Sequence, residues 1–288
     1  MPPTTTPAQT PLLSYPRVLS IAGSDSGGGA GIQADLKTFS ALGCYGMTAI
    51  TALTAQNTQG VRAIHGVPAA FLKEQLAAVI EDIGVDAVKI GMLHAPDVVE
   101  AVAWAIEHYQ LRHVVLDPVM VATSGDALIE QRTIAVLVER LFPLVSVITP
   151  NMDEAGLLLG RPVKQAVDLE AAAADLLALG AKAVLLKGGH LQDDVLTDVL
   201  AQAGQAPAQW LRLQGPRIAS HNVHGTGCTL SSAIAAHLAL GLDLQRAVQE
   251  AHAYIRGAIQ AGASVTTGHG HGPLNHGFAP VAMRVQPG

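Results

Sequence analysis

Short apolar segments alternate with segments of helical spacing along this chain of 288 residues. The first pair is representative: residues 17–22 (RVLSIA) form a short run rich in apolar and β-branched residues, and residues 31–42 place Ile32, Leu36 and Phe39 on one helical face. This alternation is typical of a parallel sheet covered by helices on both faces. Further strands are expected at 48–54, 87–90, 113–116, 145–148 and 183–186, and further helices at 69–82, 97–108, 128–141, 169–179, 230–240 and 244–261.

Each predicted strand is followed by a residue that is unusual for its place. In open parallel sheets, ligands bind at the carboxyl edge of the strands. Because these residues all follow strands, we expect them to meet at that edge and form one site. In chain order they are Asp25, Gln56, Met92, Asp117, Asn151 with Glu154, and Lys187.

A glycine-rich turn, GSDSGGGAG at 23–31, joins the first strand to the first helix. It fits the loose form of the dinucleotide fingerprint, but the next strand lacks the acidic residue which that fingerprint requires. No Lys-Ser/Thr pair closes it as in a P-loop. The glycines permit close approach of a small flat ligand, with Asp25 as a hydrogen-bond acceptor; alternatively, Asp25 only caps the helix.

The segment HGTGCTL at 224–230 precedes a long apolar helical stretch. Glycines and a helix N-terminus together favour an anion cradle, formed here by Gly225, Thr226, Gly227 and Cys228. The alternative is an ordinary helix start with Thr226 as N-cap. Since a helix N-terminus lowers a thiol pKa, we expect Cys228 to be partly thiolate at neutral pH and a candidate general base.

Three further strand ends carry groups suited to a metal–nucleotide complex. Asp117 precedes a loop of small residues at 121–125, and Lys187 precedes two glycines, which suits nucleotide phosphates. Asn151 and Glu154 have the donor atoms for Mg²⁺, which takes a few carboxylates plus waters and phosphate oxygens. They also have capping-box spacing, Asp117 could bind only turn N–H groups, and Lys187 could be solvated, so structural roles remain open.

Composition excludes several classes of protein. Apolar residues make up 49% and charged residues 14%, with a net charge of −6 and scattered Lys and Arg, which argues against nucleic-acid binding. No apolar run is long enough to span a membrane. Two cysteines in unlike contexts suggest a reducing, cytoplasmic location. Residues 1–16, rich in Pro and Thr, are expected to be a disordered tail before a single domain at 17–288.

Together these segments resemble the hydroxymethylpyrimidine/phosphomethylpyrimidine kinases of thiamine biosynthesis, in the ribokinase-like superfamily. The resemblance covers about residues 18–276. It is carried by AGSD at 22–25, GAGIQADLK at 29–37, ITALTAQNT at 50–58, KIGML at 89–93, DPVM at 117–120, LKGGH at 186–190 and HGTGCT at 224–229.

The resemblance implies a ribokinase-like three-layer α/β/α sandwich with a mainly parallel central sheet. The implied activity is ATP-dependent phosphorylation of 4-amino-5-hydroxymethyl-2-methylpyrimidine to its monophosphate and then its diphosphate, with Mg²⁺, in a homodimer. It further implies that Gln56 and Asp25 hydrogen-bond the pyrimidine, Met92 packs near its ring, Asp117, Asn151 and Glu154 serve Mg-ATP, Lys187 neutralises phosphate charge, and residues 225–228 form the anion hole.

Two alternatives remain open. A pyridoxal/pyridoxine kinase of the same superfamily would also phosphorylate a hydroxymethyl group on a small nitrogen ring, although Gln56 and Met92 favour the pyrimidine. A non-catalytic pyrimidine-binding regulator would be expected to have lost its phosphate-handling residues, which are all present. Sugar kinases of the superfamily carry an Asp as base where this chain has Cys228. Kinases of the class that this chain resembles also carry Cys there, so the identity of the base is open.

Overall fold

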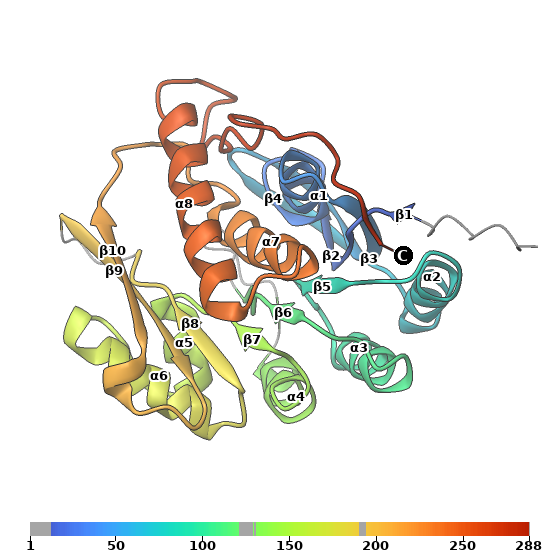
Figure 1. Cartoon of the computed structure of the whole chain (residues 1–288), viewed down its shortest axis with the longest axis horizontal. Coiled ribbons are helices and arrows are strands. Elements are labelled where there is room, and N and C mark those ends of the chain that lie inside the picture. Colours follow the sequence, from blue (N-terminus) through green and yellow to red (C-terminus); the bar gives the residue numbers. More distant parts are fainter. Residues whose placement is uncertain (1–12, 121–128, 130, 190–193, 288) are drawn as a thin grey trace, which may run out of the picture.

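The computed structural model describes residues 13–120, 129, 131–189 and 194–287. Within these residues a nine-stranded sheet has the order β10-β9-β8-β7-β6-β5-β2-β3-β4 (Figure 1). Its strands are β2 (Arg17–Asp25), β3 (Tyr45–Asn57), β4 (Gly60–Gly66), β5 (Ala87–Ile90), β6 (Val114–Leu116), β7 (Val147–Ile148), β8 (Ala183–Leu186), β9 (Val195–Gln202) and β10 (Leu211–Pro216).

The parallel part of the sheet consists of the strands expected from sequence. β3, β2, β5, β6, β7 and β8 pair in parallel, with Leu19 opposite Val88 and Ile148 opposite Val184. The apolar runs form central strands because both faces of the sheet are covered: every residue of β5, β6 and β8 is buried.

Three antiparallel strands were not expected. β4 folds back on β3, and β9 and β10 extend the opposite edge beyond β8. β4 is largely exposed and β10 alternates between exposed and half-buried positions. Strands at or next to the edge of a sheet, like these three, lack the continuous apolar run of a central strand, so the sequence pattern that found the parallel strands missed them.

Helices form a layer on each face of the sheet. One layer holds α1 (Gly31–Ala41), α7 (Thr226–Ala239) and α8 (Leu244–Gly262), whose apolar faces share one buried cluster. The other layer packs on a second cluster, and Figure 1 shows its helices on the opposite side. These are α2 (Ala69–Asp82), α3 (Pro96–His108), α4 (Gln131–Leu141), α5 (Met152–Leu159) and α6 (Leu169–Ala178), with 3-10 turns at Ala166–Asp168 and Pro207–Gln209. The predicted three-layer α/β/α sandwich is confirmed.

Some predicted boundaries were wrong. α7 begins at Thr226 rather than at residue 230, because the glycine-rich segment itself enters the helix. Part of the expected disordered tail is ordered, since β1 (Leu13–Ser14) pairs with β11 (Gln286–Pro287). The predicted small-residue loop at 121–125 and the start of the helix expected at 128–141 lie outside the described residues.

In the described part of the chain, no helix combines the length and the apolar character needed to cross a bilayer.

Candidate functional site

The structure brings the selected strand-end residues to one edge of the sheet. Backbone hydrogen bonds continue beyond the strands there: the N–H groups of Asp117, Thr149 and Lys187 donate to the carbonyls of Ile90, Leu116 and Pro150. This continuation fixes the chain just where the side chains leave the sheet. The residues gathered at this edge are Asp25, Gln56, Met92, Asp117, Asn151, Glu154 and Lys187.

The carboxylate of Asp25 organises the glycine-rich turn. It accepts hydrogen bonds from the backbone N–H groups of Gly27, Gly29 and Ala30 at 2.8, 3.0 and 2.8 Å. Burial raises the pKa of the Asp25 carboxyl, but the hydrogen bonds from His224 and the turn outweigh burial and hold the pKa below its ordinary value. Asp25 is therefore an ionised anchor of the glycine-rich turn. This role is similar to the structural alternative, in which Asp25 only caps the helix that follows.

His224 joins the turn to the rest of the site, a role that the sequence did not reveal. Its Nε2 lies 2.9 Å from Asp25 Oδ2 and 3.3 Å from the Gln56 side-chain nitrogen. The ring packs on the backbone of Gly29, where an added Cβ would come within 2.5 Å of it. The one available signal was its position at the head of the HGTGCT segment.

Gln56 lies near the end of β3 and Met92 follows β5, on either side of β2 and its glycine-rich turn. The hydroxyl of Thr54 donates to the Gln56 side-chain oxygen at 3.1 Å, which orients the amide. Met92 is 7% exposed, and its backbone carbonyl accepts a hydrogen bond from Thr51 at 2.7 Å. A half-buried amide beside a thioether can bind a small polar ring.

The segment 225–228 forms the first turn of α7, as expected for an anion cradle. The N-cap is Gly225, with φ of 86° and no side-chain hydrogen bond, so the alternative with Thr226 as N-cap is wrong. An added Cβ on Gly225 would lie 1.9 Å from the carbonyl oxygen of Gly29. The two glycine-rich segments are thus in direct contact, and no side chain caps the N-terminus of this 14-residue helix.

The thiol of Cys228 does not behave as the sequence predicted. Burial raises its pKa to about 11, against the opposing charge of Lys89 and a backbone hydrogen bond from Gly31. The expectation of a partly ionised thiol at neutral pH was wrong, because removal from water outweighs the helix N-terminus. Cys228 is a neutral thiol in the resting protein.

Lys187 and Asp117 form an ion pair next to this turn. Their side chains meet at 3.1 Å, and Asp117 also accepts from Thr149 at 3.1 Å. An added Cβ on Gly227 would lie 3.3 Å from Lys187 Nζ and 3.4 Å from Asp117 Oδ2, so the pair borders the anion loop. Burial lowers the pKa of Lys187, but the charges of Asp117 and Glu154 outweigh it and keep the lysine a cation.

Asn151 and Glu154 form the capping box of α5. Each side chain accepts from the other residue's backbone N–H at 2.8 Å. The structural alternative therefore holds for both, and any metal role is additional to it. Burial raises the pKa of Glu154 to about 7, against the opposing charge of Lys187, so this carboxyl can gain or lose a proton near neutrality.

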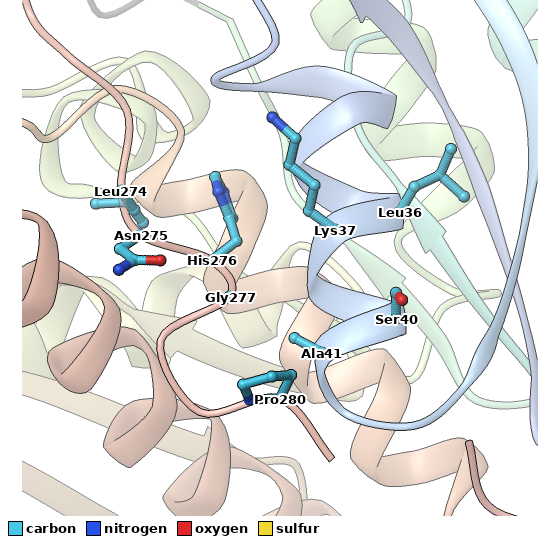
Figure 2. Close-up of a pocket in the computed structure, with 9 residues that line it drawn as sticks. All are labelled: Leu36, Lys37, Ser40, Ala41, Leu274, Asn275, His276, Gly277 and Pro280. Atoms are coloured by element: carbon cyan, nitrogen blue, oxygen red, sulfur yellow. The ribbon is translucent and has the colours of Figure 1, made fainter. Parts of the chain in front are cut away.

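A separate surface cavity of about 560 Å³ lies on the outer side of α1. Figure 2 shows it between Lys37 on α1 and the segment that carries Asn275 and His276. It touches the site only indirectly: Lys37 donates to the carbonyl of Gly28 at 2.7 Å, and His276 Nε2 lies 3.0 Å from Thr229 Oγ1.

Comparison with known proteins gives consistent results. The family model for phosphomethylpyrimidine kinase matches residues 25–275. The hydroxymethylpyrimidine/phosphomethylpyrimidine kinase of Rhizobium meliloti strain 1021 is 50% identical over 259 residues, covering 90% of this chain and 96% of that protein. The Geobacter sulfurreducens thiamine biosynthesis bifunctional protein ThiED is 50% identical over 272 residues, 94% of this chain; the chain spans 54% of its length. The structure of an ADP complex of Bacillus subtilis pyridoxal kinase has a TM-score of 0.83 and 38% identity, covering 91% of this chain and 98% of that one.

Proposed function

The chain belongs to the phosphomethylpyrimidine kinase family, and we propose that it phosphorylates 4-amino-5-hydroxymethyl-2-methylpyrimidine from ATP, first to the monophosphate and then to the diphosphate, in thiamine biosynthesis. One observation carries the proposal: the uncapped first turn of α7 borders the Lys187–Asp117 pair at the carboxyl edge of the sheet. A helix N-terminus beside a buried cation is suited to hold a transferred phosphoryl group.

The residues at this edge of the sheet divide into two groups, one for the phosphoryl donor, ATP, and one for the phosphoryl acceptor, the pyrimidine. On the donor side, Lys187 and the N–H groups of residues 225–228 stabilise charge on the γ-phosphoryl group. Phosphoryl transfer passes through a loose transition state, so positioning and electrostatic stabilisation supply most of the catalysis. Cys228 lines the same position as a neutral thiol and shapes the hole.

On the acceptor side, Gln56 hydrogen-bonds the aminopyrimidine and Met92 packs near its ring. Asp25 contributes through the turn that it holds, because its buried carboxylate already accepts three backbone hydrogen bonds and contacts His224. The change Gln56→Leu is therefore expected to raise KM for the pyrimidine and to leave ATP affinity unchanged. An unchanged KM for the pyrimidine would remove Gln56 from the subsite.

The residues present fit a magnesium ion that arrives with the nucleotide. Asp117 Oδ2 accepts a long hydrogen bond of 3.4 Å from Ser231 Oγ, and a carboxylate oxygen held this weakly is able to coordinate a cation. Within the described ranges, no three His, Cys, Asp or Glu side chains cluster as a complete cage. This matches the preference of Mg²⁺ for one or two carboxylates plus phosphate oxygens and water. Asp117 and Glu154, with Asn151 nearby, would hold it, and it would neutralise phosphate charge.

Product analysis tests the proposed function. The protein is incubated with Mg-ATP and the hydroxymethylpyrimidine, and products are separated over time. We expect the monophosphate to appear first and the diphosphate later, with both lost on chelation of Mg²⁺. Lys187→Met should abolish most turnover, whereas the exposed Lys164→Met serves as the matched control. Absence of pyrimidine-dependent ATP turnover by the wild type would contradict the proposal and favour a non-catalytic pyrimidine-binding regulator.

A pyridoxal kinase activity is the second candidate, because Bacillus subtilis pyridoxal kinase shares 38% identity and the fold with this chain. The two activities are separated by kcat/KM measured side by side on the pyrimidine and on pyridoxal. We expect the pyrimidine to be preferred, since Gln56 and Met92 suit it. A higher kcat/KM for pyridoxal would reverse the assignment.

We also propose a cytoplasmic location and a homodimer. Both Cys44 and Cys228 are free thiols in the structure, which fits a reducing compartment. The dimer rests on the family resemblance, and light scattering on the purified protein measures it directly.

A further inference from the structure

A fully buried ion pair lies below the candidate site, and the proposed chemistry does not use it. Lys89 on β5 and Asp35 on α1 both have side chains with 0% exposure, and Lys89 Nζ lies 2.9 and 3.0 Å from the two carboxylate oxygens of Asp35. Two buried serines complete the group: Ser20 Oγ donates to Asp35 at 2.6 Å and Ser232 Oγ donates at 2.7 Å.

Stability alone is a weak explanation for this group. Two charges lose their hydration on burial, and apolar residues of similar volume often replace such a pair with no loss, or even a gain, of stability. A buried pair that is nevertheless present, with every carboxylate oxygen bonded, suggests a role in conformational specificity or in electrostatics. Its position decides which of these roles to consider.

The pair lies one helical turn below the contact between the two glycine-rich segments. An added Cβ on Gly225 would lie 1.9 Å from the carbonyl oxygen of Gly29 and 3.3 Å from the Cα of Ala30, so the start of α7 lies against the start of α1. Asp35 is four residues after Gly31 on α1, so these two residues share one helical face. Ser232 is four residues after Cys228 on α7, so these two also share a face. The Asp35–Ser232 hydrogen bond is therefore a second link between the same two faces, one turn deeper.

Each member of the group belongs to an element that carries part of the site. Ser20 lies on β2, which ends at Asp25, and Lys89 lies on β5, two residues from Gly91 and the segment that bears Met92. Asp35 and Ser232 belong to the helices that begin at the two glycine-rich segments. One buried carboxylate thus connects four elements of the acceptor and phosphoryl subsites.

We propose that the Lys89–Asp35 pair is a positioning unit for phosphoryl transfer, which locks α1 and α7 together below the anion loop. The inference rests on the proposed function.

Two variants separate the role of the Lys89–Asp35 ion pair from that of the Asp35–Ser232 hydrogen bond, which tethers α1 to α7. Lys89→Met/Asp35→Asn removes both charges together and keeps an amide that can still bond the serines, so no unpaired charge is left buried. We expect a folded protein whose kcat falls at least about tenfold, a loss of about 1.4 kcal/mol of transition-state stabilisation, with KM for both substrates changed less than about threefold. Ser232→Ala removes only the tether and should lower kcat several-fold.

Matched controls show whether any loss is merely structural. Arg17→Met/Asp86→Leu removes an ion pair of 2.7 Å at the opposite edge of the sheet, and should lower the thermal midpoint without changing kcat. Thr38→Ala removes a buried hydroxyl of α1 that donates to the carbonyl of Ala34 and takes no part in the Lys89–Asp35 group, and it should also leave kcat unchanged.

The outcomes are distinct. A folded Lys89→Met/Asp35→Asn protein with wild-type kcat would overturn the inference. Should that variant not fold, Ser232→Ala decides, and wild-type kcat there would overturn it. A KM increase equal to the kcat loss in both variants would also contradict it, since a positioning unit below the anion loop acts on the transfer step. If the wild type itself produced no phosphorylated pyrimidine, the proposed function would fail instead.

Discussion

For single residues, burial decides what the side chains of this site can do. The local sequence around Cys228 favours a thiolate, whereas burial raises the thiol pKa to about 11. Burial also raises the pKa of Glu154 to about 7. Asp25 shows the opposite outcome, because hydrogen bonds outweigh burial and keep it ionised. The ionisation state of each group at this site is thus set by the balance between its burial and the partners that it finds after folding.

The neutral state of Cys228 leads to a kinetic prediction. Cys228→Ala should lower the phosphorylation of the alcohol and of the monophosphate by similar factors, because a protonated thiol cannot accept the alcohol proton and serves both steps by shaping the hole. The two substrates are supplied separately and kcat is measured for each. Cys44→Ala, which removes a buried thiol remote from the site, is the control. A much larger loss for the alcohol would restore the general-base role.

At the scale of elements, the site depends on two loop–helix junctions that touch. Gly225, with φ of 86°, packs on the backbone of Gly29, and Asp25 and His224 fix the turn from the other side. An L side chain at such a φ is strained, and here it would also collide with a carbonyl. The first turns of α1 and α7 therefore form a single unit.

Gly225→Ala is predicted to disable this unit. Gly241 is the matched control, because its φ of 85° imposes the same backbone strain while nothing lies within 4 Å of an added Cβ. Gly241→Ala should cost about 1–2 kcal/mol of unfolding free energy and leave kcat unchanged. Gly225→Ala should cost more and lower kcat at least about tenfold. Equal effects on kcat would show that contact between the two turns is unimportant.

The segment that carries His276 lines the outer cavity and also contacts α7. Burial lowers the pKa of His276 to about 4, with further lowering by the charges of Lys37 and His224. The unfolded chain protonates this histidine near pH 6.5 and the folded protein does not, so stability is complete above that pH and is lost as the pH falls toward 4.

A pH comparison tests this element. Between pH 7.5 and 5.0, His276 should account for a loss of about 2 kcal/mol of unfolding free energy. Urea unfolding of the wild type and of His276→Gln measures the difference, and other titrating groups cancel in the comparison. An identical pH dependence in both proteins would mean that His276 is protonated equally in the folded and unfolded states.

For the whole molecule, the last residues run from the site edge to the opposite edge of the sheet. Beyond the cavity, the N–H groups of Val281 and Arg284 donate to the carbonyls of Ala41 and Gly43 at 2.9 Å, and β11 then pairs with β1. Figure 1 shows this segment passing α1 on its way to the strands near the N-terminus. It therefore covers α1 without reaching the reaction centre.

Removal of residues 281–288 should therefore separate stability from activity. We expect the thermal midpoint to fall by several degrees, because backbone bonds and the β1–β11 pairing are lost, while kcat and both KM values stay near those of the full chain. Parallel melting and turnover measurements test this. A large loss of kcat below the melting range would show that the segment supports the site directly.

The sequence by itself determined the parallel core and the edge at which the site lies. The runs that became β5, β6 and β8 are buried on both faces, so their composition was sufficient to identify them. The residues after them reach the same edge because parallel strands all end there. The weakly patterned β4, β9 and β10 were missed, since β4 and β10 are largely exposed or half-buried and only residues 199–201 of β9 are buried, so none carries a continuous apolar run.

Only the tertiary structure decided which groups become partners and how each is charged. It paired His224 with Asp25, residues that are 199 positions apart, and placed Lys89 against Asp35 in the core. It also made Cys228 a neutral thiol. The physical reason is the same in each case: burial and hydrogen bonding depend on neighbours from distant segments, and no local pattern of residues encodes those neighbours.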